Sequence, residues 1–337
     1  MPGLAFFLRG KFFPPKQITT SFEGKTVVVT GSNTGVGYAT ALKYVELAAS
    51  TVILGVRSLQ KGETAKAQIE QATGRTGVVQ VWQLDLASSE SIDAFAKRVE
   101  SLNRVDVAVL NAGILPSTFK LSKEGWENNL QVNTLGTALL AILLTPKLQA
   151  SRTAESPAHL VVVASTGHID VQLKSEDKDQ LLHKYNSDLG VGPYYQHLSS
   201  KLFMMWITRE LAYRCFDAND KPTVIVNDAC PGSCRSDVAR EFDSTLFAIV
   251  KAIGSYLLLR PAEYGARVLV GASTLGEDSQ GRWWSADGNY RPAGKYITSD
   301  EGKTLQKAMW TEVVDVLEEK VPRVKDVIAS LSKRRAL

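Results

Sequence analysis

The chain has 337 residues, enough for one large α/β domain or two smaller ones with well-buried cores. Its 39 basic and 35 acidic residues give a net charge of +4, and the only concentrated basic run, 333–335, lies at the C-terminal tip, which argues against a nucleic-acid partner. The chain has three cysteines, Cys215, Cys230 and Cys234, and no histidine stands at metal-ligand spacing from them. This argues against a disulfide framework and against a metal site. It indicates a reducing compartment, and we expect the cytoplasm.

Residues 1–23 form a predicted N-terminal leader. Its apolar residues, 4–8 and 12–13, are interrupted by Arg9 and Lys11 and are followed by two prolines. Such a segment is too short and too charged for a membrane span or a signal peptide. We expect it to pack its phenylalanines on the domain, and a small amphipathic anchor on a membrane surface is the alternative.

A glycine-rich turn follows the first predicted strand. The apolar run 26–29 leads into Gly31, Gly35 and Gly37, and an amphipathic run leaves the turn, so the pattern is strand, turn and helix. Residues without a Cβ let a pyrophosphate approach the amides at a helix N-terminus, which indicates a dinucleotide site although the spacing differs from G-x-G-x-x-G. The predicted site also includes the residues between the glycines: Ser32, Asn33, Thr34 and Val36.

Apolar runs then alternate with helical patterns, which is typical of βαβ units and a parallel sheet. Without a linker or internal repeat, the pattern predicts one doubly wound Rossmann-type α/β domain over residues 24–320, with helices on both faces of the sheet. The further predicted strands are 52–56, 78–84, 105–110, 160–164 and 224–229. The predicted helices are 35–49, 58–72, 89–103, 123–148 and 198–216.

The pattern changes after Gly232. Predicted helices at 236–259 and 261–273 include a substrate cap over about 234–260. A last short strand at 281–285, a loop at 287–295 and a helix at about 299–319 follow. Residues 321–337 are interpreted as a basic tail.

Polar residues follow several predicted strands, at the sheet edge where doubly wound proteins bind ligands. Arg57 is followed by Ser58 and Lys61, at the position where an NAD-binding site usually has an acidic residue for the ribose 2′-hydroxyl. An arginine there indicates binding of the 2′-phosphate of NADP(H). The alternative is an ordinary surface arginine. After the third strand Asp85, with Leu86 beside it, could meet an adenine amino group. After the fourth comes a small turn that would admit the cofactor closely: Asn111, Ala112 and Gly113.

The ordered motifs TGSNTGVG, LDL, NAG, VNTLG, VVVAS, SSKL and PG resemble the short-chain dehydrogenase/reductase family over about residues 24–320, most closely its long, retinol-dehydrogenase-like members common among fungal metabolic enzymes. The resemblance implies a nicotinamide cofactor and hydride transfer. It implies that Asn133 anchors a water relay, Ser165 orients the substrate oxygen and Lys201 binds the nicotinamide ribose. The loop at Pro231 and Gly232 matches the family loop beside the nicotinamide.

His197 is the main departure from the family pattern, because the family has a tyrosine four residues before its lysine. Three interpretations stay open. His197 is a substitute acid or base; Tyr194 or Tyr195 reaches in instead; or the site no longer transfers hydride and serves dehydration, isomerisation, cyclisation or binding. His168 could face the same pocket.

From these residues we expect NADP(H)-dependent reduction of a ketone or aldehyde, or the reverse reaction, on a small apolar metabolite. His197 would replace the usual acid. The sequence leaves monomer and homodimer open.

Overall fold

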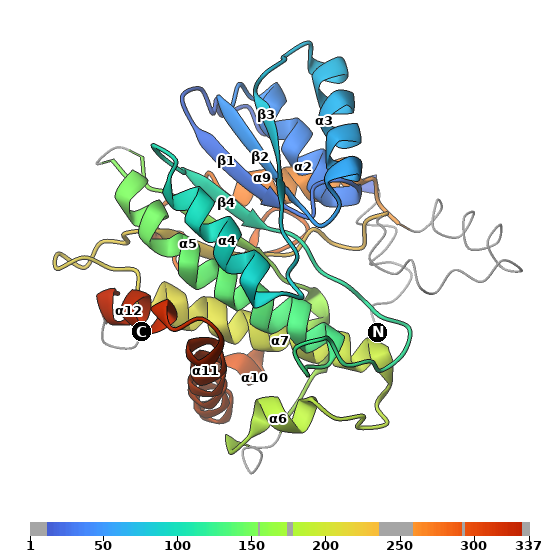
Figure 1. Cartoon of the computed structure of the whole chain (residues 1–337), viewed down its shortest axis with the longest axis vertical. Coiled ribbons are helices and arrows are strands. Elements are labelled where there is room, and N and C mark those ends of the chain that lie inside the picture. Colours follow the sequence, from blue (N-terminus) through green and yellow to red (C-terminus); the bar gives the residue numbers. More distant parts are fainter. Residues whose placement is uncertain (1–11, 154–155, 174–177, 236–258, 292–293, 332–337) are drawn as a thin grey trace, which may run out of the picture.

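A single eight-stranded sheet organises the protein, and the computed structural model describes residues 12–153, 156–173, 178–235, 259–291 and 294–331 (Figure 1). The strand order is β3-β2-β1-β4-β5-β6-β7-β8, in which only β8 runs antiparallel to its neighbour. This confirms the predicted doubly wound α/β class. The strands are β1 (Thr26–Thr30), β2 (Thr51–Val56), β3 (Val79–Gln83), β4 (Val107–Leu110), β5 (His159–Val163), β6 (Ile225–Ala229), β7 (Trp283–Trp284) and β8 (Tyr290–Arg291).

Helices cover both faces of this sheet, so the central strands are buried on both sides and read as continuous apolar runs. Helices α2, α3 and α9 enclose one apolar core, and α4, α5, α7, α11 and α12 enclose the other. The helices are α2 (Gly35–Glu46), α3 (Leu59–Thr73), α4 (Ser89–Glu100), α5 (Thr137–Ser151), α6 (Leu181–Tyr185), α7 (Gly192–Ala212), α9 (Ala262–Ala272), α10 (Lys295–Thr298), α11 (Asp300–Lys320) and α12 (Arg323–Ser330).

The helix predicted at 123–148 begins later than expected. An antiparallel bridge joins Leu121 to Glu127, so residues 121–127 are not helical. The helical run begins at Asn128 and passes into a π-helical segment, η1 (Leu130–Gly136), which continues into α5. π-helical turns are rare and are frequent at functional sites.

Helix α7 also differs from its prediction, since it starts at Gly192 rather than at residue 198. Pro193 fits its first turn, where a backbone N–H has no helical partner in any case. The earlier start places His197 within the same helix as Lys201. The two side chains are therefore held by one rigid element.

The C-terminal part contains three helices or strands that the sequence analysis missed, one of which is the short helix α10. Strand β8 lies within the predicted loop 287–295, and α12 lies within the predicted basic tail. Val324 of α12 is fully buried in the apolar core, and Arg323 forms an ion pair with Asp93 of α4. The tail prediction is thus wrong for 323–330, because an apolar face outweighs the local charge. The helix predicted at 236–259 lies outside the described residues except for its last position.

The described part of the leader corrects another expectation. Phe12 and Phe13 are 69% and 73% exposed, so they do not pack on the domain. Phe22 does, with its ring edge-on to Tyr44 at a centroid distance of 4.8 Å. Among the described residues, no helix has the length and apolarity needed to cross a membrane.

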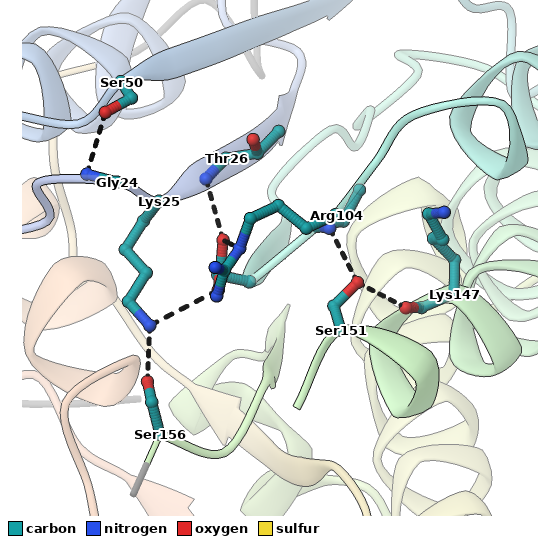
Figure 2. Close-up of polar contacts among 10 residues, drawn as sticks. Gly24, Lys25, Thr26, Ser50, Arg104, Lys147, Ser151 and Ser156 are labelled. Carbon is teal, nitrogen blue, oxygen red and sulfur yellow. Dashed lines mark hydrogen bonds and ion pairs between the residues drawn. The ribbon is translucent and has the colours of Figure 1, made fainter. Parts of the chain in front are cut away.

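A buried ionic cluster joins the amino ends of β1 and β4, at the edge of the sheet opposite the carboxyl ends. Asp106 is 4% exposed, and its Oδ2 accepts a hydrogen bond from the Thr26 N–H at 2.9 Å. The carboxylate also forms ion pairs with Arg104 and with Lys25, whose Nζ lies 3.4 Å from Oδ1. Figure 2 shows Lys25 reaching both this cluster and Ser156. The cluster therefore ties the start of the chain's first strand to the centre of the sheet.

Candidate active site

A cavity of about 540 Å³ lies at the carboxyl ends of the parallel strands. It collects most of the residues that the sequence analysis singled out, from six different strand ends. Those that line it are Gly31, Asn33, Thr34, Gly35, Val36, Gly37, Arg57, Asp85, Leu86, Asn111, Ala112, Gly113, Ser165, His197, Lys201, Pro231 and Gly232. Cys230 and Cys234, both free thiols, also contribute to the wall.

The glycine turn is packed too tightly for side chains. Gly31 has φ +63°, and a Cβ on it would lie 2.9 Å from Ala112 Cα. A Cβ on Gly37 would lie 2.4 Å from both Gly31 O and Asn111 Nδ2. Asn111 itself donates to Thr30 O at 3.0 Å, so the turn after β4 holds the turn after β1.

Helix α2 presents open amides to this cavity. Its N-cap, Thr34, makes no side-chain capping bond, and its first turn has no acidic residue. Ser32 points elsewhere, since its hydroxyl donates to Val29 O at 2.9 Å. A helix N-terminus with unfilled N–H groups beside close-packed glycines fits the pyrophosphate of a dinucleotide.

Replacing Gly37 by alanine tests this fit. The new Cβ meets backbone and a fixed amide, so we expect nucleotide affinity to fall by about tenfold or more. Fluorescence titration with NADPH measures the effect. Gly276→Ala is the control, because its Cβ meets only the flexible Asp278 side chain, at 3.2 Å. Equal affinities of the two variants would contradict the placement of the pyrophosphate.

Two cationic residues and one carboxylate line the cavity after β2 and β3. Arg57 is exposed and forms no ion pair with a described residue, and Lys61 lines the same wall. Asp85 is partly held by its own turn, where its Oδ1 accepts the Ala87 amide at 3.0 Å. Because neither cation is neutralised there, this end suits a group with additional negative charge.

Asn133 lies behind the cavity wall rather than in it. Its side-chain amide pairs with both backbone groups of Ile114: Oδ1 accepts from the N–H at 2.9 Å, and Nδ2 donates to the carbonyl at 3.0 Å. Nδ2 also lies 3.1 Å from Ser200 Oγ. The side chain is 1% exposed, so it acts here as a clamp between η1, α7 and the loop after β4.

The clamp fixes the tautomer of His197. The ring's Nδ1 lies 2.9 Å from Ile114 O, which can only accept, so Nδ1 carries the proton and donates it. Asn133 Nδ2 is farther from Nδ1, at 3.4 Å, and has better acceptors. The hydrogen bonds of the ring to described residues all involve Nδ1, so Nε2 is left as a lone-pair acceptor on a side chain that lines the cavity.

Electrostatics keep His197 neutral. Burial, and to a lesser degree the Lys201 cation, lower the pKa of His197 to about 4, against the opposing effect of the Ile114 hydrogen bond. Burial also lowers the pKa of Lys201 to about 8, opposed by Cys230 and Asp228. Near neutral pH the pair is therefore a neutral imidazole beside a lysine that is still mainly charged.

Lys201 and Ser165 complete the polar end of the cavity. Lys201 Nζ donates to Val163 O at 2.9 Å, which leaves two of its three protons for a ligand. Ser165 Oγ accepts the Gly167 amide at 3.2 Å, so its own proton remains free to donate. Both residues line the same cavity as His197.

Three predicted substrate contacts are not brought into this cavity. His168 is buried behind it; its Nδ1 lies 2.5 Å from Ser165 O, and its ring sits edge-on to Trp283. Tyr194 is 55% exposed, and Tyr195 packs against the apolar core. None of the three lines the cavity, although Tyr194 precedes His197 and Lys201 by three and seven residues and so starts on the same side of α7.

Several lining residues were missed by the sequence analysis. They follow the predicted cofactor turn after β4, lie on or just before η1, or follow β5: Ile114, Leu115, Pro116, Asn128, Val132 and Thr166. The apolar run directly after the Asn-Ala-Gly turn is the one signal that could have indicated them. No three His, Cys, Asp or Glu residues of the described ranges come together as a metal site.

Comparisons with known proteins agree on one family. A family model described as short chain dehydrogenase matches residues 25–172. The short-chain dehydrogenase/reductase phmF of Phaeosphaeria nodorum is 44% identical over 317 residues, 93% of this chain and 92% of that protein. The short-chain dehydrogenase/reductase ffsI of Aspergillus flavipes is also 44% identical, over 95% of this chain and 93% of its own length.

Solved structures show the same architecture. A Mycobacterium paratuberculosis protein is 25% identical with a TM-score of 0.64, over 89% of this chain and 96% of that one. A short chain dehydrogenase of Shigella flexneri, solved in complex with NADP, is 22% identical with a TM-score of 0.55, over 80% of this chain and 99% of that one.

Proposed function

Because this chain belongs to the short-chain dehydrogenase/reductase family, we propose that it carries out NADP(H)-dependent hydride transfer between a small, fairly apolar alcohol and its ketone or aldehyde. One observation carries the proposal: a single cavity holds the glycine turn, the two cationic residues after β2 and the group Ser165, His197 and Lys201. When bound, the nicotinamide cofactor supplies or accepts the hydride.

Each polar residue then has a task that its geometry supports. Ser165 donates its free proton to the substrate oxygen, and Lys201 holds the nicotinamide ribose with its remaining protons. Nε2 of His197 takes the proton of a substrate hydroxyl, because Nδ1 is committed to Ile114 O. Asn133 keeps Ile114, and through it the imidazole, in position. A neutral imidazole with this tautomer is a base, so of the two directions that the sequence left open the arrangement favours alcohol oxidation.

The wall beside His197 supports an apolar substrate. Ile114, Leu115, Pro116 and Val132 line the cavity next to the catalytic group. A pocket of mainly apolar residues with a few convergent polar groups is typical of sites for small molecules.

The direct test supplies purified protein with NADP⁺ and a panel of secondary alcohols, and with NADPH and the matching ketones. We expect a change in NADPH absorbance with at least one apolar pair. Substrate turnover without a change in absorbance would replace the proposal by non-redox chemistry, and nucleotide affinity without any turnover would replace it by a binding role.

The tautomer also gives the non-redox alternative a specific basis. Because the ring N–H of His197 is committed to Ile114 O, only the lone pair of Nε2 remains for a ligand. A base of this kind also fits a dehydration, isomerisation or cyclisation that begins with proton removal. The absorbance test above separates the two.

Arg57→Ala tests the choice of NADP(H). A charge-assisted bond to the 2′-phosphate is worth about 1.5–3 kcal/mol, so we expect NADPH affinity to fall by about tenfold or more while NADH affinity changes little. Titration with each nucleotide measures the difference. Lys66→Ala is the control, because Lys66 lies on α3, the helix that follows Arg57, and outside the cavity. An equal loss for both nucleotides would contradict a 2′-phosphate contact.

The pH profile follows from the two lowered pKa values. His197 is unprotonated above pH about 4 and Lys201 is charged below pH about 8. We therefore expect kcat/KM for oxidation to rise through pH 4 to 5 and to fall above about 8, whereas reduction falls about tenfold per pH unit above 4. Rates measured over this range check both. An acidic limb that persists in His197→Gln would contradict the assignment.

The cytoplasm remains the proposed compartment, supported by three free cysteines. The proposal requires no partner other than a small-molecule substrate, and it is compatible with a monomer or a homodimer.

A further inference from the structure

A second cavity, of about 310 Å³, lies at the far edge of the sheet and shares no lining residue with the first. It is enclosed by α7, by the ends of β6, β7 and β8, and by the end of α10. Its lining residues include six with distinctive chemistry: Arg209, Asp228, Arg282, Trp283, Tyr290 and Arg291. This volume is at the lower end of the range of small-molecule sites.

Two buried polar atoms in this wall lack partners among the described residues. They are Asp228 Oδ1 and Trp283 Nε1, on side chains of residues that are 1% and 5% exposed. The two residues are paired in register across β6 and β7, so their side chains lie on the same face of the sheet. Unpartnered buried polar groups cost free energy, so an acceptor for the indole N–H and a partner for the carboxyl oxygen belong in this space.

Three arginines give the cavity an excess of positive charge. Arg209 has neutral partners, Gln306 Oε1 at 3.2 Å and the Tyr213 hydroxyl at 2.9 Å. Arg282 forms no ion pair with a described residue and lies 5.4 Å from the Tyr290 ring centroid. Arg291 alone has an exposed acidic partner, Asp287.

Asp228 forms no ion pair with any of these three arginines, and its Oδ1 has no hydrogen-bond partner among the described residues. Burial raises the pKa of its carboxyl well above the usual range, against the opposing effects of a hydrogen bond from Thr208 and of the Arg209 and Lys201 charges. The described wall thus offers two guanidinium groups without an anionic partner.

The same wall is partly apolar, because Met205 and the rings of Trp283 and Tyr290 face the cavity between the charged groups. We propose that this cavity binds a small organic anion, a carboxylate carried on an apolar body. Arg209 and Arg282 hold the carboxylate, which also accepts the Trp283 N–H, while the aromatic rings contact the apolar body.

Calorimetric titration of the full chain with benzoate tests this site. We expect saturable binding with one benzoate per chain, and no binding of benzamide, which has the same ring without the charge. Arg209→Gln and Arg282→Gln should each weaken benzoate binding by about tenfold or more, since each removes a charge-assisted bond. Trp283→Phe should weaken it by a smaller factor, because it removes a neutral donor.

Lys307→Gln is the matched control, since it removes one exposed positive charge from α11 without touching the cavity. Thermal melting establishes that each variant is folded, and Arg209→Lys, which keeps the charge, should bind better than Arg209→Gln. The absence of saturable benzoate binding to the wild type would overturn the proposal and leave a cavity filled by water. Binding of inorganic phosphate in place of benzoate, or equal benzoate affinity in all variants, would also overturn it.

Discussion

Replacing His197 by alanine should lower kcat for hydride transfer by about 10²- to 10⁴-fold, the range typical for loss of a positioned proton-transfer group. Among the described residues that line the cavity with Ser165 and Lys201, His197 is the only histidine. Nucleotide affinity should change little, because the glycine turn and Arg57 lie at the other end of the cavity. Steady-state kinetics with the best alcohol, together with a nucleotide titration, measures both quantities.

His183→Ala is the control, since His183 is an exposed histidine whose ring contacts Trp126 outside the cavity. Equal activity of wild type and His197→Ala would remove His197 from the mechanism and return attention to Tyr194 and Tyr195. His197→Tyr restores the residue of the family pattern. A wild type that is inert while His197→Tyr is active would show that the native protein does not transfer hydride.

His197→Gln separates positioning from proton transfer. A glutamine side chain can still donate a hydrogen bond to Ile114 O, but it cannot accept a proton at neutral pH. If His197 acts as a base, this variant should be as slow as His197→Ala and should lose the acidic limb of the oxidation profile. If His197 only holds the loop after β4, the variant should keep most of the activity.

The sheet and the cofactor end of the site were predictable from the sequence because both depend on local patterns. Strands buried on both faces are continuous apolar runs, and the turn at Gly31 and Gly37 requires residues without a Cβ wherever it occurs. Parallel strands bring their carboxyl ends to one edge, so Arg57, Asp85 and Asn111 could be assigned to one cavity without coordinates.

The chemistry of His197 was not predictable, because it depends on contacts across the fold. The proton position follows from the Ile114 carbonyl, 83 residues earlier in the chain, and that carbonyl is held by Asn133 on η1. Neither the π-helical segment nor the direction of a backbone carbonyl leaves a sequence pattern. For the same reason α12 was missed, since its short apolar face gains stability only against α5 and α11.

The second large effect concerns stability. Asp106→Ala should lower the free energy of unfolding by about 2–4 kcal/mol. This cost lies between the typical costs of breaking a buried ion pair and of breaking an exposed one. The substitution leaves the Thr26 amide without its 2.9 Å acceptor and leaves Arg104 and Lys25 without their shared carboxylate. The two cations are 38% and 24% exposed, so water recovers part of the loss.

Chemical denaturation of the full chain measures this change against two matched variants. Asp106→Asn keeps an oxygen for the Thr26 amide but removes the charge, so it should lose less stability than Asp106→Ala. Glu46→Ala removes the partner of Lys43 from a more exposed pair on α2 and should cost less than about 1 kcal/mol. If Asp106→Ala costs no more than Glu46→Ala, the cluster does not hold β1 to β4. A loss of the expected size with unchanged nucleotide affinity would show that the amino edge of the sheet supports the fold independently of the cavity at the opposite edge.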